Sequence, residues 1–181
     1  FADPDVFDKV PYFCFLLQES GYMHIQATKP DTVGVGLSSS PLGLAAYIME
    51  KFSTWTDPAW RELRDGGLET RAAIGKDRML TNVMIYWITN SITSSMRYYK
   101  ENLSSYDTAV ANTPVVVPVG FADLPHELTR APRHQLTGKF PRLVSYTSLA
   151  SGGHFSAMEV PEHLAADVIN FASKVETMER L

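Results

Sequence analysis

A short β-branched run near the middle of the chain restricts the folds open to this sequence. It reads Pro114-Val115-Val116-Val117-Pro118-Val119 and is apolar throughout. A buried strand of a parallel sheet has this character, because both of its faces are covered. Residues 143–147 form a second candidate strand, and Pro161 opens an amphipathic helix. The order strand, excursion, strand, helix indicates an α/β fold.

The chain before this run is predicted to be mostly helical. Ser40 and Pro41 favour a helix start, because serine caps the free N–H groups and proline suits the first turn. A second long helix is predicted over residues 77–102. Its apolar stripe, at helical spacing, comprises Leu80, Met84, Trp87, Ile88 and Ile92. We therefore expect a helical region over residues 1–107 and an α/β region over residues 108–181.

Composition excludes several classes of protein. The chain has 181 residues and 45% hydrophobic residues, which suffices for one well-buried core or for a core plus a lid. A net charge of −4 argues against nucleic acid as a partner. The single cysteine, Cys14, excludes an internal disulfide and a cysteine-based zinc site. No apolar run approaches the roughly 18 residues of a membrane span. Because the chain begins at Phe1 without a methionine or a signal-peptide pattern, we expect a processed or cleaved start.

A glycine-loosened loop after the second candidate strand carries a histidine, in the order Gly152-Gly153-His154-Phe155. The loop after the first candidate strand carries two carboxylates, Asp123 and Glu127. Active sites of α/β proteins lie beyond the carboxyl ends of parallel strands, so these side chains are expected to meet. An acid on one loop can orient a histidine on the next, and the histidine can then take a proton from water. The glycines would allow a positive φ and a tight turn.

Plainer interpretations of these residues stay open. A histidine after two glycines is often a polar turn residue, and carboxylates on loops are usually solvated. His126-Glu127 does not begin a zinc motif, because Arg130 stands where a second histidine is needed. The stretch Gly36-Leu37-Ser38-Ser39-Ser40 lacks the final glycine of a serine nucleophile elbow.

Several longer motifs resemble the microsomal-type epoxide hydrolases, a family that includes the insect juvenile hormone epoxide hydrolases. The resemblance extends over nearly the whole chain. The motifs are Gly21-Tyr22-Met23-His24-Ile25-Gln26-Ala27-Thr28-Lys29-Pro30, Ser40-Pro41-Leu42-Gly43-Leu44-Ala45, Phe52-Ser53-Thr54-Trp55, Arg97-Tyr98-Tyr99-Lys100 and Gly152-Gly153-His154-Phe155.

This resemblance implies an α/β-hydrolase fold with a helical cap, here the cap plus the last strands and helix of the core sheet. It implies that an aspartate opens an epoxide and forms an ester, which water then hydrolyses to a diol. By matching motif, the cap tyrosines that hydrogen-bond the epoxide oxygen are Tyr22 and Tyr99, the acid is Glu127 and the general base is His154. Tyr98 is set aside because it faces about 100° away from Tyr99 on a helix. Asp123 is the weaker candidate for the acid.

The chain departs from the family pattern at the nucleophile, since no segment matches an aspartate elbow with its glycines and following tryptophan. We therefore expect a C-terminal portion that needs an N-terminal portion as a partner and lacks epoxide turnover alone. The family further implies an endoplasmic reticulum location through an N-terminal membrane anchor not present here. No metal or organic cofactor is implied. Expected partners are an apolar epoxide and water.

Two other functions stay open at this point. A catalytically inactive α/β-hydrolase-like protein could bind a hydrophobic ligand or act as a scaffold. An esterase or dehalogenase is disfavoured, because ester cleavage does not need paired cap tyrosines. The aromatic side chains of the first region suit an apolar epoxide but do not separate a xenobiotic arene oxide from a hormone epoxide. They are Phe13, Phe15, Trp55, Trp60 and Trp87.

Overall fold

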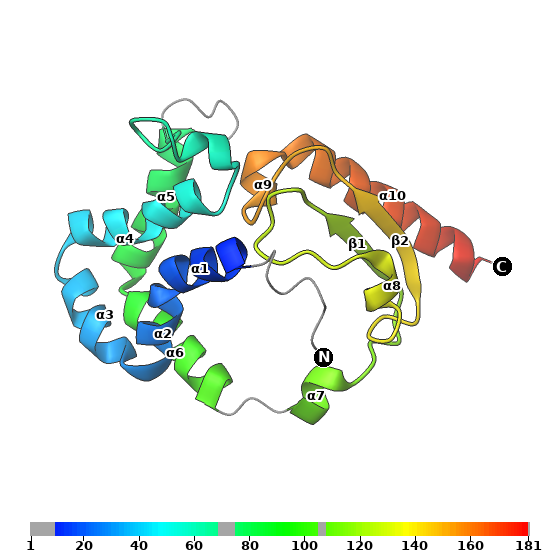
Figure 1. The fold of residues 1–181 in the computed structure, drawn as a ribbon, viewed down its shortest axis with the longest axis horizontal. Helices are drawn as coiled ribbons and strands as arrows, with labels where there is room; N and C mark the ends of the chain where they lie inside the picture. Colours follow the sequence, from blue (N-terminus) through cyan, green and yellow to red (C-terminus); the bar gives the residue numbers. More distant parts are fainter. Residues whose placement is uncertain (1–9, 69–74, 105–107, 181) are drawn as a thin grey trace. The chain divides into compact units, whose positions relative to one another are not determined.

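The computed structural model describes residues 10–68, 75–104 and 108–180 (Figure 1). The start at Phe1 and the first residues of the chain lie outside this range, as does the side chain of Phe13. The first six helical elements are α1 (Val10–Glu19), α2 (Gly21–Thr28), α3 (Pro30–Ser38), α4 (Pro41–Thr54), the 3-10 helix η2 (Pro58–Trp60) and α5 (Lys76–Thr89). The rest are α6 (Ile92–Ser104), α7 (Thr108–Asn112), β1 (Val119–Asp123), α8 (Arg133–Leu136), β2 (Leu143–Ser148), α9 (Ser156–Glu159) and α10 (Pro161–Glu179).

The chain forms two compact units. Unit 1 comprises Phe1–Ala46 and Val83–Tyr106, and unit 2 comprises Tyr47–Asn82 and Asp107–Leu181. The chain passes from one unit to the other within α4 and returns within α5. The sequence predicts a cap over residues 1–107 and part of a core over residues 108–181. That division is a different one from the two compact units, and it stays a prediction.

Unit 1 is built on the packing of α6 along α2 and α3. Gly34 lets α3 approach α6 closely, because a Cβ atom there would lie 2.9 Å from Cβ of Thr93. Beside this contact, Arg97 of α6 donates from Nε to Oδ1 of Asp31 at 2.8 Å. The small residue and the ion pair together fix the spacing between these two helices.

Replacing Gly34 with alanine is expected to destabilise the protein by about 1–3 kcal/mol, because the added methyl forces α3 away from Thr93. Gly36→Ala in the same helix is the matched control, since nothing lies within 4 Å of a Cβ there. It is expected to gain about 0.5–1 kcal/mol from the higher helix propensity of alanine. Urea unfolding of both variants measures the two free energies. Equal effects of the two substitutions would contradict this account.

The helix predicted at Ser40 and Pro41 is confirmed. α4 begins at Pro41, and the Ser40 hydroxyl accepts a hydrogen bond from the Gly43 N–H at 3.0 Å. This is the capping contact that serine provides at a helix start. The predicted final helix is also confirmed, because α10 begins at Pro161.

The prediction of one helix over residues 77–102 is wrong, because the segment forms two helices, α5 and α6. Asn90 has a φ of 52° and ends α5. The N–H of Ser91 then bonds the carbonyl of Tyr86 at 3.1 Å, as in a helix terminus closed by a left-handed residue. The predicted apolar stripe is only partly right: Ile92 is buried, but Leu80, Met84 and Ile88 are exposed. On α5 the buried residues are instead Met79 and Val83.

Unit 2 contains the sheet, in which β1 and β2 are parallel. The second predicted strand, residues 143–147, is confirmed as β2. The first is misplaced, because β1 begins only at Val119 and residues 114–118 are not a strand. Pro114 and Pro118 have no N–H to donate to a ladder. Asp123 is consequently the last residue of β1 and not part of the following loop.

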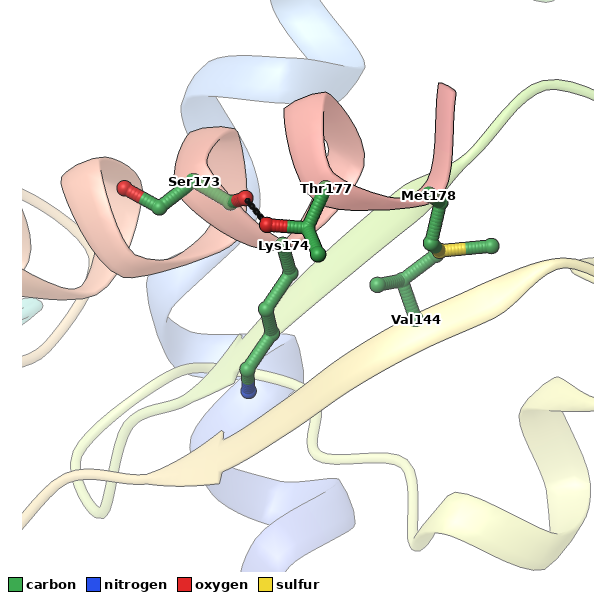
Figure 2. A pocket seen from close by; sticks show the side chains of 5 residues that line it. All are labelled: Val144, Ser173, Lys174, Thr177 and Met178. Carbon is green, nitrogen blue, oxygen red and sulfur yellow. Dashed lines mark hydrogen bonds between the residues drawn. The ribbon is translucent and has the colours of Figure 1, made fainter. Parts of the chain in front are cut away.

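α10 covers β1 closely, because β1 has no side chain at Gly120. A Cβ atom there would lie 2.9 Å from the ring of Phe171 on α10. Between α10 and β2 lies an open groove of about 360 Å³ (Figure 2). Its lining residues are Val144, Ser173, Lys174, Thr177 and Met178. Val144 stands near the start of β2, whereas His154 follows its end, so this groove is separate from the predicted site residues of unit 2.

Among the described residues, no single helix is long and apolar enough to cross a membrane. Only α3 and α4 together pass that test of length and composition, and they are bent by 120° at their junction.

Candidate active site

Two loops leave the same edge of the sheet, because β1 and β2 are parallel neighbours. The Glu127 loop (residues 124–130) follows β1, and the His154 loop (residues 149–155) follows β2. A further parallel bridge joins His126 to Gly153, with the His126 N–H bonding the Gly152 carbonyl at 3.1 Å. The two loops therefore run side by side up to the predicted site residues.

His154 and Glu127 form a hydrogen bond between Nδ1 and Oε1 at 2.8 Å. The same carboxylate oxygen accepts a bond from the Leu128 N–H at 2.7 Å, which fixes its direction. Opposite an ionised carboxylate, which only accepts, Nδ1 is the donor; in the neutral tautomer of the ring the Nε2 lone pair can then take a proton from water. His154 is 39% exposed, which leaves its ring accessible. This arrangement can support general-base catalysis.

The sequence-based expectation of a positive φ is confirmed at Gly152, where φ is 102°. A side chain there would also collide, since a Cβ atom would lie 2.7 Å from Cγ2 of Val160. Glycine is the residue that adopts this conformation without strain. This turn directs the chain toward His154.

Gly153 is needed for a different reason, namely close approach of the backbone. A Cβ atom there would lie 2.9 Å from the carbonyl oxygen of His126 and 3.0 Å from that of Trp55. The same Trp55 carbonyl accepts the His154 N–H at 3.1 Å. The second glycine therefore lets His154 be fixed to a segment far away in the sequence.

Trp55 is a site residue that the sequence analysis assigned only to an aromatic lid. Its side chain is buried, and its ring meets the His154 imidazole edge to face, with centroids 5.1 Å apart. Next to it, Phe155 stacks on Phe52 at 4.1 Å, within the core cluster that includes Met79. Trp55 belongs to one of the motifs that carry the family resemblance, but no spacing in the sequence links it to His154.

Asp123, the weaker candidate for the acid, is paired with Arg130 and not with His154. Arg130 donates from Nε to Oδ1 at 2.9 Å and from Nη2 to Oδ2 at 2.5 Å. The Asp123 carboxylate is almost fully buried, and the Arg130 side chain is half exposed. The hydrogen bond from the Arg130 guanidinium lowers the pKa of Asp123 below its usual range, and burial opposes this effect.

This lowered pKa predicts a pH-dependent contribution to stability. Because the folded state favours the ionised carboxylate, the contribution is complete above the usual carboxyl pKa of about 4 and disappears as the pH falls through the lowered value. Asp123→Asn is expected to cost about 1 kcal/mol at pH 7, a small figure because Arg130 is half solvated. Urea unfolding at pH 7 and pH 3 should show the difference from the native protein shrinking at the lower pH. A constant difference would contradict it.

The predicted tyrosines both lie in unit 1, Tyr22 on α2 and Tyr99 on α6. Their rings meet edge to face, with centroids 5.8 Å apart and an interplanar angle of 83°. Tyr98 is 66% exposed, whereas Tyr99 is half buried, so the two neighbours face different surroundings as the helical period requires. Unit 1 therefore brings together the two hydroxyl-bearing side chains, and unit 2 brings together His154 and Glu127.

Among the described residues, His154 is the one histidine that is paired with a carboxylate. His126 is half buried, and its Nδ1 is enclosed without a hydrogen-bond partner among these residues. Among the same residues, no group of three or more His, Cys, Asp or Glu side chains is placed to hold a metal ion.

The sequence of this chain is similar to those of known epoxide hydrolases. No family model matches the chain. The chain is 52% identical over 170 residues to Epoxide hydrolase 1 of Oryctolagus cuniculus, an alignment that covers 93% of this chain and 37% of that protein. It is 49% identical over 166 residues to Juvenile hormone epoxide hydrolase 2 of Ctenocephalides felis, covering 90% of this chain and 35% of the relative. The chain thus spans about a third of the length of these curated relatives.

Solved structures agree with the sequence relatives. The crystal structure of juvenile hormone epoxide hydrolase from the silkworm Bombyx mori matches 98% of this chain and 43% of that chain, with a TM-score of 0.88 and 44% identity. Epoxide hydrolase of Aspergillus niger matches 97% of this chain and 41% of that one, with a TM-score of 0.70 and 27% identity. These neighbours have the α/β-hydrolase fold, which confirms the fold class expected from the sequence. The chain belongs to the microsomal-type epoxide hydrolase family, which includes the juvenile hormone epoxide hydrolases.

Proposed function

We propose that the complete protein hydrolyses apolar epoxides to vicinal diols, with residues 1–107 as its cap and residues 108–181 as part of its core. The observation that carries the proposal is the 2.8 Å hydrogen bond between His154 and Glu127 on neighbouring post-strand loops. It is supported by the pair of tyrosine rings 5.8 Å apart in unit 1. The relatives named above, which are epoxide hydrolases, point to the same reaction.

The first step of the proposed reaction opens the epoxide. A carboxylate oxygen of an aspartate attacks one epoxide carbon, the carbon–oxygen bond breaks, and a hydroxyalkyl ester forms. The leaving oxygen gains negative charge, which the hydroxyls of Tyr22 and Tyr99 stabilise and protonate. A phenol suits this role because it is a neutral donor at working pH. The aspartate belongs to a part of the complete protein that this chain does not contain.

The second step hydrolyses the ester. Nε2 of His154 takes a proton from water, and the hydroxide attacks the ester carbonyl. The ester bond to the diol oxygen breaks, and His154 returns its proton to the departing alkoxide. The second proton of the water passes from the new aspartate carboxyl to the tyrosinate left by the first step, so that the aspartate carboxylate and both tyrosine hydroxyls are restored and the diol is released. Glu127 holds the imidazole through Nδ1 and stabilises its charged form. No cofactor takes part in either step of this proposal.

A single-turnover experiment in ¹⁸O-labelled water tests the proposal. With the complete protein in excess over an aryl epoxide, the first diol formed should carry no label, because its new oxygen comes from the aspartate. Direct attack of water would label the diol at once and would contradict the ester route. Failure to form diol from any apolar epoxide, with the ligand still bound, would favour a hydrophobic-ligand-binding protein. The chain alone, without the rest of the protein, is expected to form no diol.

Two substrate classes remain within the proposal, xenobiotic arene or alkene oxides and juvenile-hormone-like epoxides. A relative named for juvenile hormone and one named only as an epoxide hydrolase are similarly close to this chain, at 49% and 52% identity, so their names do not separate the two classes. The ratio of kcat/KM for a terpenoid epoxide ester to kcat/KM for an aryl epoxide decides between them. The proposal also includes attachment to the endoplasmic reticulum membrane through a segment outside this chain. Recovery of the complete protein in the soluble cell fraction would contradict that part.

A further inference from the structure

The Glu127 loop is closed at its base by an ion pair. Asp123, the last residue of β1, lies directly before the loop, and Arg130 is the loop's last residue. The two parallel hydrogen bonds of 2.9 and 2.5 Å between them form a fork, in which both carboxylate oxygens are engaged. A fork of this kind fixes orientation as well as distance, since two bonds between planar groups prevent rotation.

Asp123 also contacts the segment that leads to His154. Its main-chain carbonyl accepts the Leu149 N–H at 2.9 Å, at the start of the His154 loop. Its Oδ2 atom lies 3.4 Å from the hydroxyl of Ser148, the last residue of β2. Asp123 is therefore the point where the strand ends and both loops are joined. The Asp123 side chain is 6% exposed, so water reaches this pair mainly from the side of the half-exposed Arg130.

The Glu127 carboxylate depends on the path of its own loop. Within the loop, the Glu127 N–H bonds the Leu124 carbonyl at 3.3 Å, and the Leu128 N–H bonds Oε1 at 2.7 Å. These bonds lie inside the loop and do not fasten its end to the sheet. The fork to Arg130 does so, aided by the Tyr146 hydroxyl, which donates to the Ala131 carbonyl at 3.3 Å.

We propose that Asp123 and Arg130 are positioning residues, whose fork holds the Glu127 loop so that Glu127 can orient His154. The inference rests on the proposed function only for its kinetic consequence. Breaking the fork frees the end of the loop and lengthens the bond between Oε1 and Nδ1. The histidine then loses its fixed tautomer and direction. In the proposed reaction this slows hydrolysis of the ester, the step that needs His154, and leaves ester formation unchanged.

Proton NMR of the complete protein labelled with ¹⁵N-histidine tests the geometry without any substrate. The Nδ1 proton of His154, bonded to a carboxylate, should give a low-field resonance, which His154→Gln identifies by its disappearance. Asp123→Asn should move this resonance to higher field and speed its exchange with water. Arg130→Lys keeps the positive charge but cannot form the fork, so it should produce a smaller shift in the same direction.

Single-turnover kinetics with an aryl epoxide give the second readout. Asp123→Asn should slow ester hydrolysis by between about 10- and 100-fold, so that ester accumulates and is seen by intact-protein mass spectrometry. Glu176→Gln is the control, because it removes a carboxylate from an exposed pair with Arg180 on α10. That variant should match the native protein in both readouts.

Four results separate the possible outcomes. An unchanged Nδ1 resonance in folded Asp123→Asn and Arg130→Lys proteins would overturn the inference. An equal shift in Glu176→Gln would do the same, because the effect would not be specific to the fork. If the native protein forms no ester, the proposed function fails, and the NMR result alone still decides on the positioning role. If Asp123→Asn does not fold, Arg130→Lys decides it, because the Arg130 side chain is half exposed.

Discussion

Replacing His154 with glutamine in the complete protein is expected to trap the covalent ester. In the proposed reaction the aspartate opens the epoxide without the histidine, but the ester then lacks the base that activates water. Removal of a general base slows a step by about 10²–10⁴-fold, so the ester becomes the dominant form of the enzyme. Intact-protein mass spectrometry after mixing with an epoxide should show an added mass equal to that of the substrate.

The matched control for this experiment is His163→Gln, the same substitution at an exposed histidine of α10 in the same unit. It should form diol at the native rate without accumulating ester. Near-native turnover of the His154→Gln protein would remove His154 from the role of base. Complete loss of turnover without any added mass would place its role in the first step.

Replacing Tyr99 or Tyr22 with phenylalanine is expected to have the opposite kinetic signature. Each change removes one hydroxyl that is proposed to stabilise the alkoxide, while leaving the edge-to-face packing of the rings in place. Loss of one such donor costs about 10²–10³-fold in rate, and this loss falls on the ring-opening step. Stopped-flow measurement should therefore show slow ester formation with no accumulation of ester.

Tyr98→Phe is the control for the tyrosines, because Tyr98 adjoins Tyr99 in the chain and is 66% exposed. It should keep native rates for both steps. If Tyr98→Phe slowed ring opening and Tyr99→Phe did not, the assignment carried by the motif would be one residue out of register. Accumulated ester in Tyr99→Phe would instead assign that hydroxyl to the second step.

The order of elements in unit 2 could be predicted from the sequence, but the start of the first strand could not. Residues 115–117 are more β-branched than those of β1, and they still do not form a strand. Pairing decides the matter, because Val119 lies opposite Leu143 and Asp123 lies opposite Ser148. The register between two segments depends on tertiary contacts, which local propensity does not contain.

The break between α5 and α6 is indicated in the sequence only by Asn90, and the apolar pattern on both sides favours one continuous helix. Asn90 interrupts no periodicity and is neither glycine nor proline. Asparagine is nevertheless the residue that, after glycine, most readily takes the left-handed conformation that closes a helix. The apolar residues continue across the break, so a pattern of spacing alone extends the helix too far.

Some contacts of the candidate site could likewise be predicted from the sequence, whereas others depend on tertiary structure. The proximity of His154 and Glu127 could be expected from two loops beyond neighbouring parallel strands. The contribution of Trp55 could not, because it comes from a segment about 100 residues earlier that reaches His154 only in the folded unit. The ion pair between Asp123 and Arg130 could not be predicted either. Asp123 is expected in a loop from the sequence, and Arg130 enters the sequence analysis only because it stands where a zinc motif needs a histidine.

The stacking of Phe155 on Phe52 has a consequence for how the candidate site can be altered by mutation. The residue after the proposed base is part of the core, so the base cannot be re-aimed by changes in its own loop alone. A bulkier or smaller residue at Phe52 would shift Phe155, and with it the imidazole, without touching a substrate. Selection for activity on new epoxides should therefore change these two positions together. Substitutions of Phe52 alone should lower the activity per mole of folded protein, and not only the yield of protein.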